Sequence, residues 1–239
     1  GFSFAAISLA DAGIIISGRE GSKPSMDALV DNGKPVLPIP FLGWDAFAIY
    51  RDILENWNES PVCGLTERQY LELMKPWRRN PVTLFRLLKA ALATEPEIFI
   101  SYRRDDNPVA AGRLFDELAH SYGQNLVFID YAGLLGGQAL EDILTKVEQS
   151  RVLLLVVGDN WITERLEDPT DYVRREIIAA QKNGLRVIPV LAGHTARPAV
   201  QQIPEPLQFI LNLKFLPLQM DDWEVGVNRL KQTIDDVVL

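Results

Sequence analysis

The sequence predicts an α/β protein whose main domain is a doubly wound parallel sheet of five strands. Across residues 96–239, short apolar and β-branched strands alternate with segments of helical period, as in that fold class. Residues 152–158 form one wholly apolar strand, which is expected at the centre of a parallel sheet. Polar and charged residues follow directly after residues 98–101, at the carboxyl edge where open α/β sheets bind ligands.

Each expected strand is a short apolar run that ends at a turn or a charged segment. The five strands are residues 98–101, 126–130, 152–158, 186–191 and 214–218. We predict the flavodoxin-like order, in which the first strand lies between the second and the third, followed by the fourth and the fifth.

The expected helices place apolar residues three or four positions apart. They cover residues 108–122, 139–147, 172–181 and 223–238. Asn183 and Gly184 follow the third of these, which is a common signal for the carboxyl end of a helix.

The N-terminal part has a different organisation. A strand at residues 13–17 runs into the turn Gly18-Arg19-Glu20-Gly21-Ser22, and a helix at 25–31 and a strand at 35–39 follow. Two strands are too few for an independent sheet, so this part is expected to be the C-terminal portion of a larger Rossmann-like domain. Residues 66–93 read as a helical connector broken at Pro76 and Pro81. The expected domains are therefore residues 1–65, a connector at 66–94, and residues 95–239.

Composition excludes several classes of function. The net charge of −8 disfavours general nucleic-acid binding, because it repels a phosphate backbone. The longest apolar run, Val152–Val157, is too short for a membrane span, and we expect no secretion signal. A single cysteine, Cys63, indicates no internal disulfide and a cytoplasmic protein. With two histidines, no zinc-ligand spacing exists, so no metal site is expected.

Four segments carry a family resemblance. EIFISYRRDD at residues 97–106 contains the first, VFID at 127–130 precedes a glycine-rich loop at 131–137, and DYVRREI at 171–177 and RVIPVL at 186–191 follow. Their order and spacing resemble a Toll/interleukin-1 receptor (TIR) domain over residues 96–239. The resemblance implies a cytoplasmic enzyme that cleaves NAD⁺ between nicotinamide and ribose, with NAD⁺ as substrate and no cofactor.

Glu176 corresponds to the catalytic glutamate of TIR enzymes. Nicotinamide leaves NAD⁺ as a neutral base, so no general acid is needed. One carboxylate beside the ribose can stabilise the oxocarbenium-like transition state. The alternative is that Glu176 is a solvated helix residue paired with Arg104 or Lys182.

The other residues expected around NAD⁺ follow the strands or lie one helical turn from Glu176. They are Ser101, Tyr102, Arg103, Arg104, Asp130, Leu135, Trp161 and Tyr172. An arginine fork suits a pyrophosphate, or it could position Glu176, whereas ordinary ion pairing is the alternative for both arginines. Tyr172 would stack on a base where the family more often has tryptophan. For Trp161, packing against the next helix is an equal alternative.

The N-terminal turn SGREGS at residues 17–22 is similar to the glycine-rich loop of the SLOG superfamily, including its STALD-type sensors. The expected ligand-binding residues are Gly18, Arg19, Glu20, Gly21, Ser22 and Lys23. Backbone N–H groups and a helix start favour a phosphate there. Ser25 stands where LOG enzymes carry a catalytic glutamate, which argues for binding without catalysis. An ordinary β–α turn is the alternative.

Together, the resemblances imply a bacterial antiphage-defence NAD⁺ hydrolase, with ADP-ribosyl cyclase activity also open. A cyclic or ADP-ribose-like nucleotide would activate it at the N-terminal domain, and TIR–TIR self-association, including filaments, would assemble it. The rival hypothesis is a non-catalytic TIR adaptor, and a nucleotide-processing SLOG enzyme is disfavoured by Ser25. Asp130 as a phospho-acceptor of a receiver domain is also disfavoured, because an acidic pair should then follow the first strand.

Overall fold

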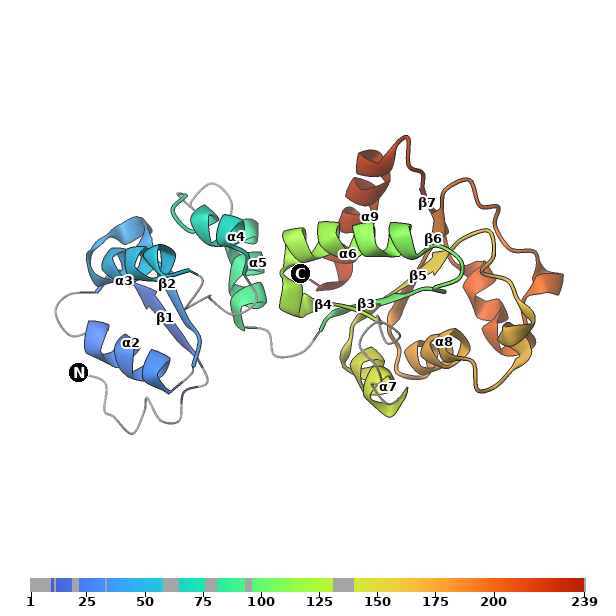
Figure 1. The fold of residues 1–239 in the computed structure, drawn as a ribbon, viewed down its shortest axis with the longest axis horizontal. Coiled ribbons are helices and arrows are strands. Elements are labelled where there is room, and N and C mark those ends of the chain that lie inside the picture. The colour runs from blue at the N-terminus through green and yellow to red at the C-terminus, as the bar shows by residue number, and fades with distance from the viewer. Residues whose placement is uncertain are drawn as a thin grey trace. The chain divides into compact units, whose positions relative to one another are not determined.

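The computed structural model describes residues 10, 12–18, 22–32, 34–57, 65–75, 81–92, 96–130 and 140–238 (Figure 1). The chain forms two compact units. The first is Gly1–Thr94 with Tyr122–Asn125, and the second is Glu95–Ser121 with Leu126–Leu239. The finer division at residue 65 stays a prediction.

The C-terminal unit alternates strands with helices. In chain order its elements are β3 (Ile98–Ser101), α6 (Pro108–Tyr122), η3 (Gln124–Leu126), β4 (Val127–Ile129), α7 (Leu140–Gln149), β5 (Val152–Val157), η4 (Glu164–Glu167), α8 (Tyr172–Lys182), β6 (Arg186–Ala192), η5 (Val200–Gln202), η6 (Glu205–Asn212), β7 (Leu216–Leu218) and α9 (Trp223–Val238).

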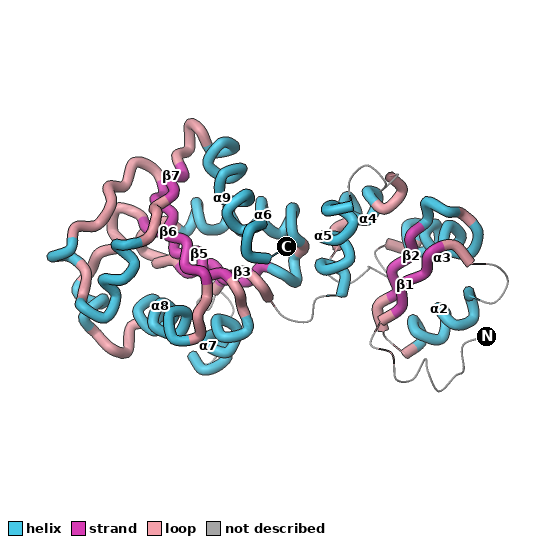
Figure 2. The backbone as a smooth tube through the Cα atoms, turned by 180° about the vertical axis from the view of Figure 1, so that it is seen from behind, coloured by secondary structure: helices cyan, strands magenta, loops and turns pink. Residues whose placement is uncertain are grey.

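The five strands form one parallel sheet in the order β4-β3-β5-β6-β7, which confirms the predicted topology. The register places Ile98 between Val127 and Val152. Helices α6 and α9 cover one face of the sheet, and α7 and α8 cover the other (Figures 1 and 2). This is the three-layer arrangement expected for strands joined by helical crossovers.

The core of this unit is built around the central strand, β5. Every residue of β5 is buried, because helices cover both faces of the sheet. On the α7 and α8 face, the buried cluster contains Phe99, Leu153 and Leu155 from the sheet and Val173 and Ile177 from α8. The apolar face of α8 therefore fixes where the helix lies over the strands.

Two details of this unit differ from the sequence-based expectation. The last strand begins at Leu216, two residues later than predicted. The 3₁₀ helix η6 was not predicted. Pro206 lies at its start, where a proline needs no N–H partner, and its Leu207 and Ile210 are fully buried in the core.

The N-terminal unit contains one β–α–β element followed by helices. Its elements are β1 (Gly13–Ile16), α2 (Ser22–Asp31), β2 (Val36–Ile39), η1 (Pro40–Leu42), α3 (Trp44–Glu55), α4 (Glu67–Glu72) and α5 (Pro81–Leu92). Strands β1 and β2 pair in parallel. Helix α2 begins three residues before the expected start. Pro81 opens α5 rather than breaking a helix, which suits proline because the first helical N–H needs no partner.

Helix α3 was also not predicted from the sequence. It starts after Gly43, whose φ of 76° requires a residue without a side chain. The N–H groups of Asp45 and Ala46 donate to the carbonyl groups of Gly18 and Ser17. The turn after β1 thus caps α3, a long-range contact that no local pattern reveals.

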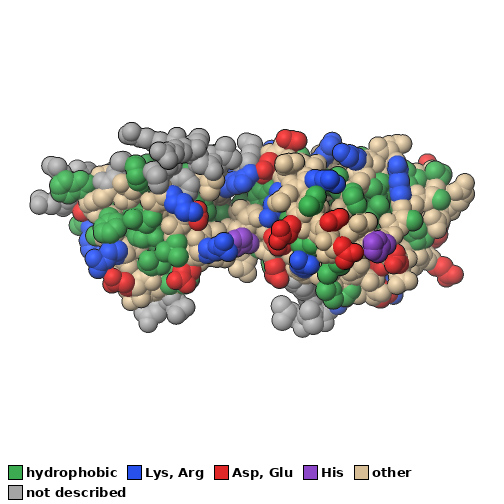
Figure 3. Space-filling model, turned by 90° about the horizontal axis from the view of Figure 1, so that it is seen from above, with side chains coloured by type: hydrophobic (Ala, Val, Ile, Leu, Met, Phe, Trp, Pro, Cys, Tyr) green, Lys and Arg blue, Asp and Glu red, His purple; other side chains and the backbone are tan. Residues whose placement is uncertain are grey.

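Aromatic contacts join α3 to α4. The rings of Tyr50 and Tyr70 stack at 4.7 Å, and the Tyr70 hydroxyl donates to the Tyr50 carbonyl. Thr66 and Gln69 form a capping box that starts α4. Hydrophobic side chains also gather on the face of the N-terminal unit that Figure 3 shows. In this unit, Ile16 and Trp44 are 61% and 59% exposed.

In the C-terminal unit, the loop after β3 is fastened to the loop after β5. The Asp106 carboxylate accepts hydrogen bonds from the backbone N–H groups of Gly158, at 2.8 Å, and Asn160, at 2.7 Å. The neighbouring Asp105 instead forms an exposed ion pair with Arg165. Two adjacent aspartates therefore have different structural roles.

We predict that Asp106→Ala lowers the free energy of unfolding by about 1–3 kcal/mol, because it leaves the buried Gly158 N–H without an acceptor. Asp105→Ala is the matched control and should cost about 1 kcal/mol or less, since its ion pair is exposed. Urea unfolding of the three proteins measures both. Equal losses for the two variants would contradict the assigned role of Asp106.

Candidate functional site

The candidate site lies at the carboxyl edge of the five-stranded sheet. Ser101 is the last residue of β3, and Asp130 follows the end of β4. Glu176 lies in the second turn of α8, close to Ser101, and only 2% of its surface is exposed. The Ser101 hydroxyl donates to Glu176 Oε2 at 2.5 Å. The structure therefore brings together three residues that were predicted to be in the site.

The charge state of Glu176 follows from its surroundings. Burial raises the pKa of the Glu176 carboxyl group to about 8, because the charged form loses its hydration. The Ser101 hydrogen bond and the positive charge of Arg103 oppose this shift, whereas the negative charges of Asp130 and Asp171 add to it. At neutral pH, Glu176 of the ligand-free protein is mainly protonated.

Arg103 and Asp171 form a buried ion pair beside Glu176. The Arg103 Nη1 and Nη2 groups donate to the two Asp171 carboxylate oxygens at 2.9 and 3.0 Å, and Nε donates to the Trp161 carbonyl at 2.9 Å. The two side chains are only 3% and 7% exposed. Arg103 is thus buried and paired rather than part of a surface ion pair.

Asp171 is the residue of this site that the sequence reading left without a role. It is the N-cap of α8, and its Oδ1 accepts from the Arg174 N–H at 2.9 Å. Aspartate directly before an amphipathic segment is a recognisable N-cap signal. That signal predicts the cap, whereas the partner across the fold, Arg103, can be seen only in the structure.

The other predicted residues occupy different environments. Trp161 is fully buried in the core cluster with Leu166 and Val173, so its ring packs against α8. Tyr172 is 48% exposed, although Glu176 one turn later is buried. Tyr102 is half-buried and Arg104 is exposed. Their contacts with NAD⁺ stay predictions, and Leu135 lies outside the described residues.

The N-terminal site is only partly described. Gly18 has a φ of 116°, which favours glycine, and Ser22 and Lys23 open α2. Lys23 Nζ lies 3.3 Å from the Asp27 carboxylate in an exposed pair. Arg19, Glu20 and Gly21 lie outside the described residues. Nucleotide binding by this loop stays a prediction.

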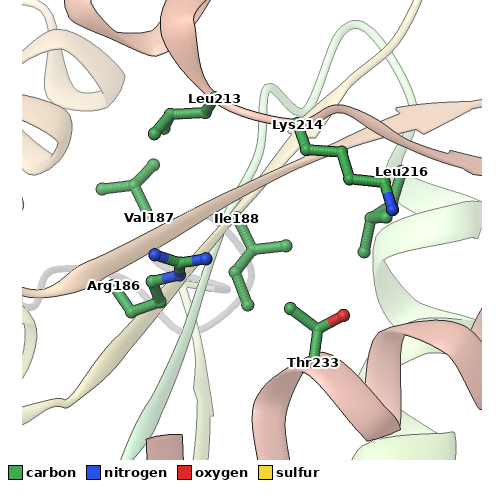
Figure 4. Close-up of a pocket in the computed structure, with 7 residues that line it drawn as sticks. All are labelled: Arg186, Val187, Ile188, Leu213, Lys214, Leu216 and Thr233. Atoms are coloured by element: carbon green, nitrogen blue, oxygen red, sulfur yellow. The ribbon is translucent and has the colours of Figure 1, made fainter. Parts of the chain in front are cut away.

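Two cavities lie at the opposite, amino-terminal edge of the sheet. One, of about 70 Å³, is lined by the starts of β6 and β7 and by α9 (Figure 4), and it includes Arg186, Ile188, Lys214 and Thr233. The other, of about 460 Å³, also includes Arg186. Both cavities lie at the starts of the strands, whereas Glu176 lies beside the end of β3. Neither cavity therefore belongs to the Glu176 site.

In the described part of the chain, the histidine, aspartate, glutamate and cysteine side chains form no group of three or more that would hold a metal ion. None of the helices in this part of the chain is both long enough and apolar enough to cross a membrane.

The C-terminal unit is a doubly wound α/β domain with the flavodoxin-like strand order. It carries a buried carboxyl group, that of Glu176, at the carboxyl edge of its sheet. Comparison with known families matches residues 98–231 to the TIR domain. The chain belongs to the TIR domain family.

Curated relatives include the NAD(+) hydrolase sarm1 of Drosophila melanogaster, 25% identical over 143 residues, and the NAD(+) hydrolase SARM1 of Danio rerio, 26% identical over 142 residues. Each match covers 59% of this chain but only 10% and 20% of the relative, so the chain spans a minor part of their length.

Similar solved structures include the TIR domains of the activated Roq1 resistosome, at 17% identity and a TM-score of 0.45, covering 59% of this chain and 99% of the other. A metazoan TIR-STING receptor from C. gigas in complex with 2',3'-cGAMP matches at 19% identity and a TM-score of 0.39, covering 55% and 38%.

We predict that Glu176→Gln changes how stability depends on pH. Because the folded-state pKa of Glu176 is raised, its contribution to stability is present below about pH 4.5 and is lost as the pH rises to about 8. The glutamine variant carries no such charge. Its stability relative to the wild type should rise across that window, by about 1.4 kcal/mol per unit of pKa difference. Urea unfolding at pH 5 to 9 measures this, and parallel stability curves would show that the pKa is not raised.

Proposed function

We propose that the C-terminal unit cleaves the bond between nicotinamide and ribose in NAD⁺, with Glu176 as the catalytic carboxylate. The observation that carries this proposal is the Glu176 carboxyl group itself, held by Ser101 at the carboxyl edge of the sheet. Membership of the TIR domain family and the names of the curated relatives support the same reaction.

The proposed chemistry needs one carboxylate and water. The bond from the ribose carbon to the nicotinamide nitrogen breaks, and its electron pair neutralises the pyridinium. The ribose carbon develops positive charge, which an ionised Glu176 beside it would stabilise. Water then adds to that carbon and releases a proton, giving ADP-ribose. Attack by a nitrogen of the adenine ring would instead give a cyclic product.

The surroundings of Glu176 link its ionisation to substrate binding. In the ligand-free protein the carboxyl group is buried and protonated at neutral pH. The nicotinamide ring of NAD⁺ is a cation, and a cation nearby favours the charged form of a carboxyl group. Binding of NAD⁺ would therefore lower the pKa of Glu176 and form the catalytic carboxylate where it is needed. This also requires Glu176 to become accessible to the ribose.

A non-catalytic adaptor is the second candidate. The burial of Glu176 favours this candidate, because a carboxyl group that is only 2% exposed offers little surface to a substrate. The two candidates differ in one measurable property, which is the release of nicotinamide from NAD⁺ by the purified protein.

We predict that Glu176→Gln lowers the turnover of NAD⁺ by a factor on the order of 10² or more, because the amide cannot stabilise a developing cation by charge. Glu224→Gln, an exposed position in the first turn of α9, is the control and should keep wild-type turnover. Released nicotinamide is measured by chromatography, and circular dichroism checks the fold. Normal turnover in a folded Glu176→Gln protein would exclude the assigned role, and none in the wild type would favour the adaptor.

We also propose how the activity is controlled. The glycine-rich loop at residues 131–137 would contact a neighbouring TIR domain, up to the formation of filaments. The turn at residues 18–23 would bind a cyclic or ADP-ribose-like nucleotide, as in SLOG sensors of antiphage defence. The parallel β1–α2–β2 element and the left-handed backbone at Gly18 support a phosphate-binding turn there.

We predict that the turnover per protein molecule rises with protein concentration and rises further when the activating nucleotide is added. The test is nicotinamide release at several protein concentrations, with and without ADP-ribose and a panel of cyclic nucleotides. Lys23→Glu should remove the nucleotide effect and leave the basal rate. Turnover that is independent of both concentration and nucleotide would contradict this mode of control.

A further inference from the structure

The guanidinium group of Arg103 is buried, and each of its three nitrogens donates one hydrogen bond inside the protein. Two of its nitrogens donate to the Asp171 carboxylate, and the third donates to the Trp161 carbonyl. A bidentate pair of this geometry is the arrangement that guanidinium and carboxylate groups favour most. Because Arg103 is only 4% exposed and already pairs with Asp171, little of its guanidinium group is available to a phosphate. This argues against direct contact with the NAD⁺ pyrophosphate.

The ion pair connects the two elements that carry the Ser101–Glu176 hydrogen bond. Arg103 follows Ser101 by two residues at the end of β3, and Asp171 caps α8 five residues before Glu176. One Asp171 oxygen, Oδ1, bonds both to Arg103 and to the Arg174 N–H inside α8. The start of α8 is thereby fixed to the end of β3. Any shift of the helix along the sheet would break these bonds.

We propose that Arg103 and Asp171 are positioning residues, whose buried ion pair fixes α8 so that the Glu176 carboxyl group lies against Ser101. This inference rests on the proposed function of Glu176 and adds how the protein holds that residue in place. Of the two roles expected for Arg103, it favours the positioning of Glu176 over contact with the substrate.

The electrostatics of the site provide a test that separates positioning from general stability. Four groups besides burial act on the pKa of Glu176: Ser101 at the end of β3, Arg103 just after β3, Asp130 after β4, and Asp171 at the start of α8. The Arg103 charge lowers the pKa of Glu176, whereas the Asp171 charge raises it. Removing one partner leaves the charge of the other uncompensated. The two single variants should therefore shift the pKa of Glu176 in opposite directions.

The variants are chosen so that the helix cap survives. Asparagine caps helices about as well as aspartate, so Asp171→Asn removes the charge and keeps the acceptor for the Arg174 N–H. Arg103→Gln removes the positive charge, and the double variant removes both charges. The double variant leaves no unpaired buried charge, so it should fold even if one of the single variants does not.

The first measurement does not depend on activity. Carbon-13 NMR of labelled glutamate side chains, with the Glu176 signal assigned from Glu176→Gln, follows the titration of Glu176 in the ligand-free protein. We expect Asp171→Asn to lower the pKa of Glu176, Arg103→Gln to raise it, and the double variant to lie between them. Shifts in the same direction for both single variants, or no shift in any variant, would overturn the proposal.

The second measurement is steady-state kinetics against pH. Arg103→Lys keeps the positive charge but cannot form the bidentate pair with Asp171, so the Glu176 carboxylate should be misplaced. We expect kcat to fall by a factor on the order of 10², while KM stays within about twofold. A large rise in KM with unchanged kcat would instead show that Arg103 binds substrate. If the wild type cleaves no NAD⁺ while the opposite NMR shifts appear, the reaction is wrong and the positioning of Glu176 stands.

Discussion

Burial of the Glu176 carboxyl group is the constraint on which the rest of the candidate site depends. A carboxylate removed from water is strongly destabilised unless it is neutralised or paired. Here one hydroxyl group, that of Ser101, donates to it, and the group is neutral at physiological pH. The Ser101 hydrogen bond and the Arg103–Asp171 ion pair hold the buried Glu176 side chain in a fixed geometry.

Those contacts concentrate at the carboxyl edge of the sheet. Asp106 joins the loop after β3 to that after β5, and Arg103 joins the loop after β3 to the start of α8. Both connections start from the segment that follows β3, the strand that pairs with both β4 and β5. The loop after β3 is thus fixed both to the loop after β5 and to the start of α8, the helix that carries Glu176.

A neutral, buried glutamate is a poor stabiliser of positive charge, and yet the proposed reaction needs the charged form. The two facts agree if the substrate itself supplies the missing partner. The pyridinium ring of NAD⁺ is cationic before the reaction and neutral after it, so the carboxylate would be favoured while substrate is bound and disfavoured once nicotinamide has left. In this scheme, the same burial that keeps Glu176 neutral in the ligand-free protein also strengthens its interaction with the transition state.

The two units differ in how completely their sheets are buried. The C-terminal unit covers both faces of its sheet with helices, and its central strand is fully buried. In the N-terminal unit, β1 alternates buried and exposed residues, and Ile14 and Ile16 remain 44% and 61% exposed. A two-stranded parallel sheet has little apolar area to bury by itself. Its helices α3 and α4 compensate through the stacked pair Tyr50 and Tyr70.

The sequence by itself determined most of the strand and helix pattern of the C-terminal unit, because apolar periodicity and helix ends are local properties. The strand order was predicted from the fold class that this pattern indicates. The sequence also pointed to Ser101 and Glu176 through the order and spacing of four short segments. Only the tertiary structure decided that Glu176 is buried, that Arg103 pairs with Asp171, and that Trp161 lies in the core. Helix α3 was missed for the same reason, since its cap comes from Ser17 and Gly18. Burial and pairing depend on residues far apart in the chain, 75 positions for Ser101 and Glu176, and the energy of a charge depends on the medium that the whole fold creates around it.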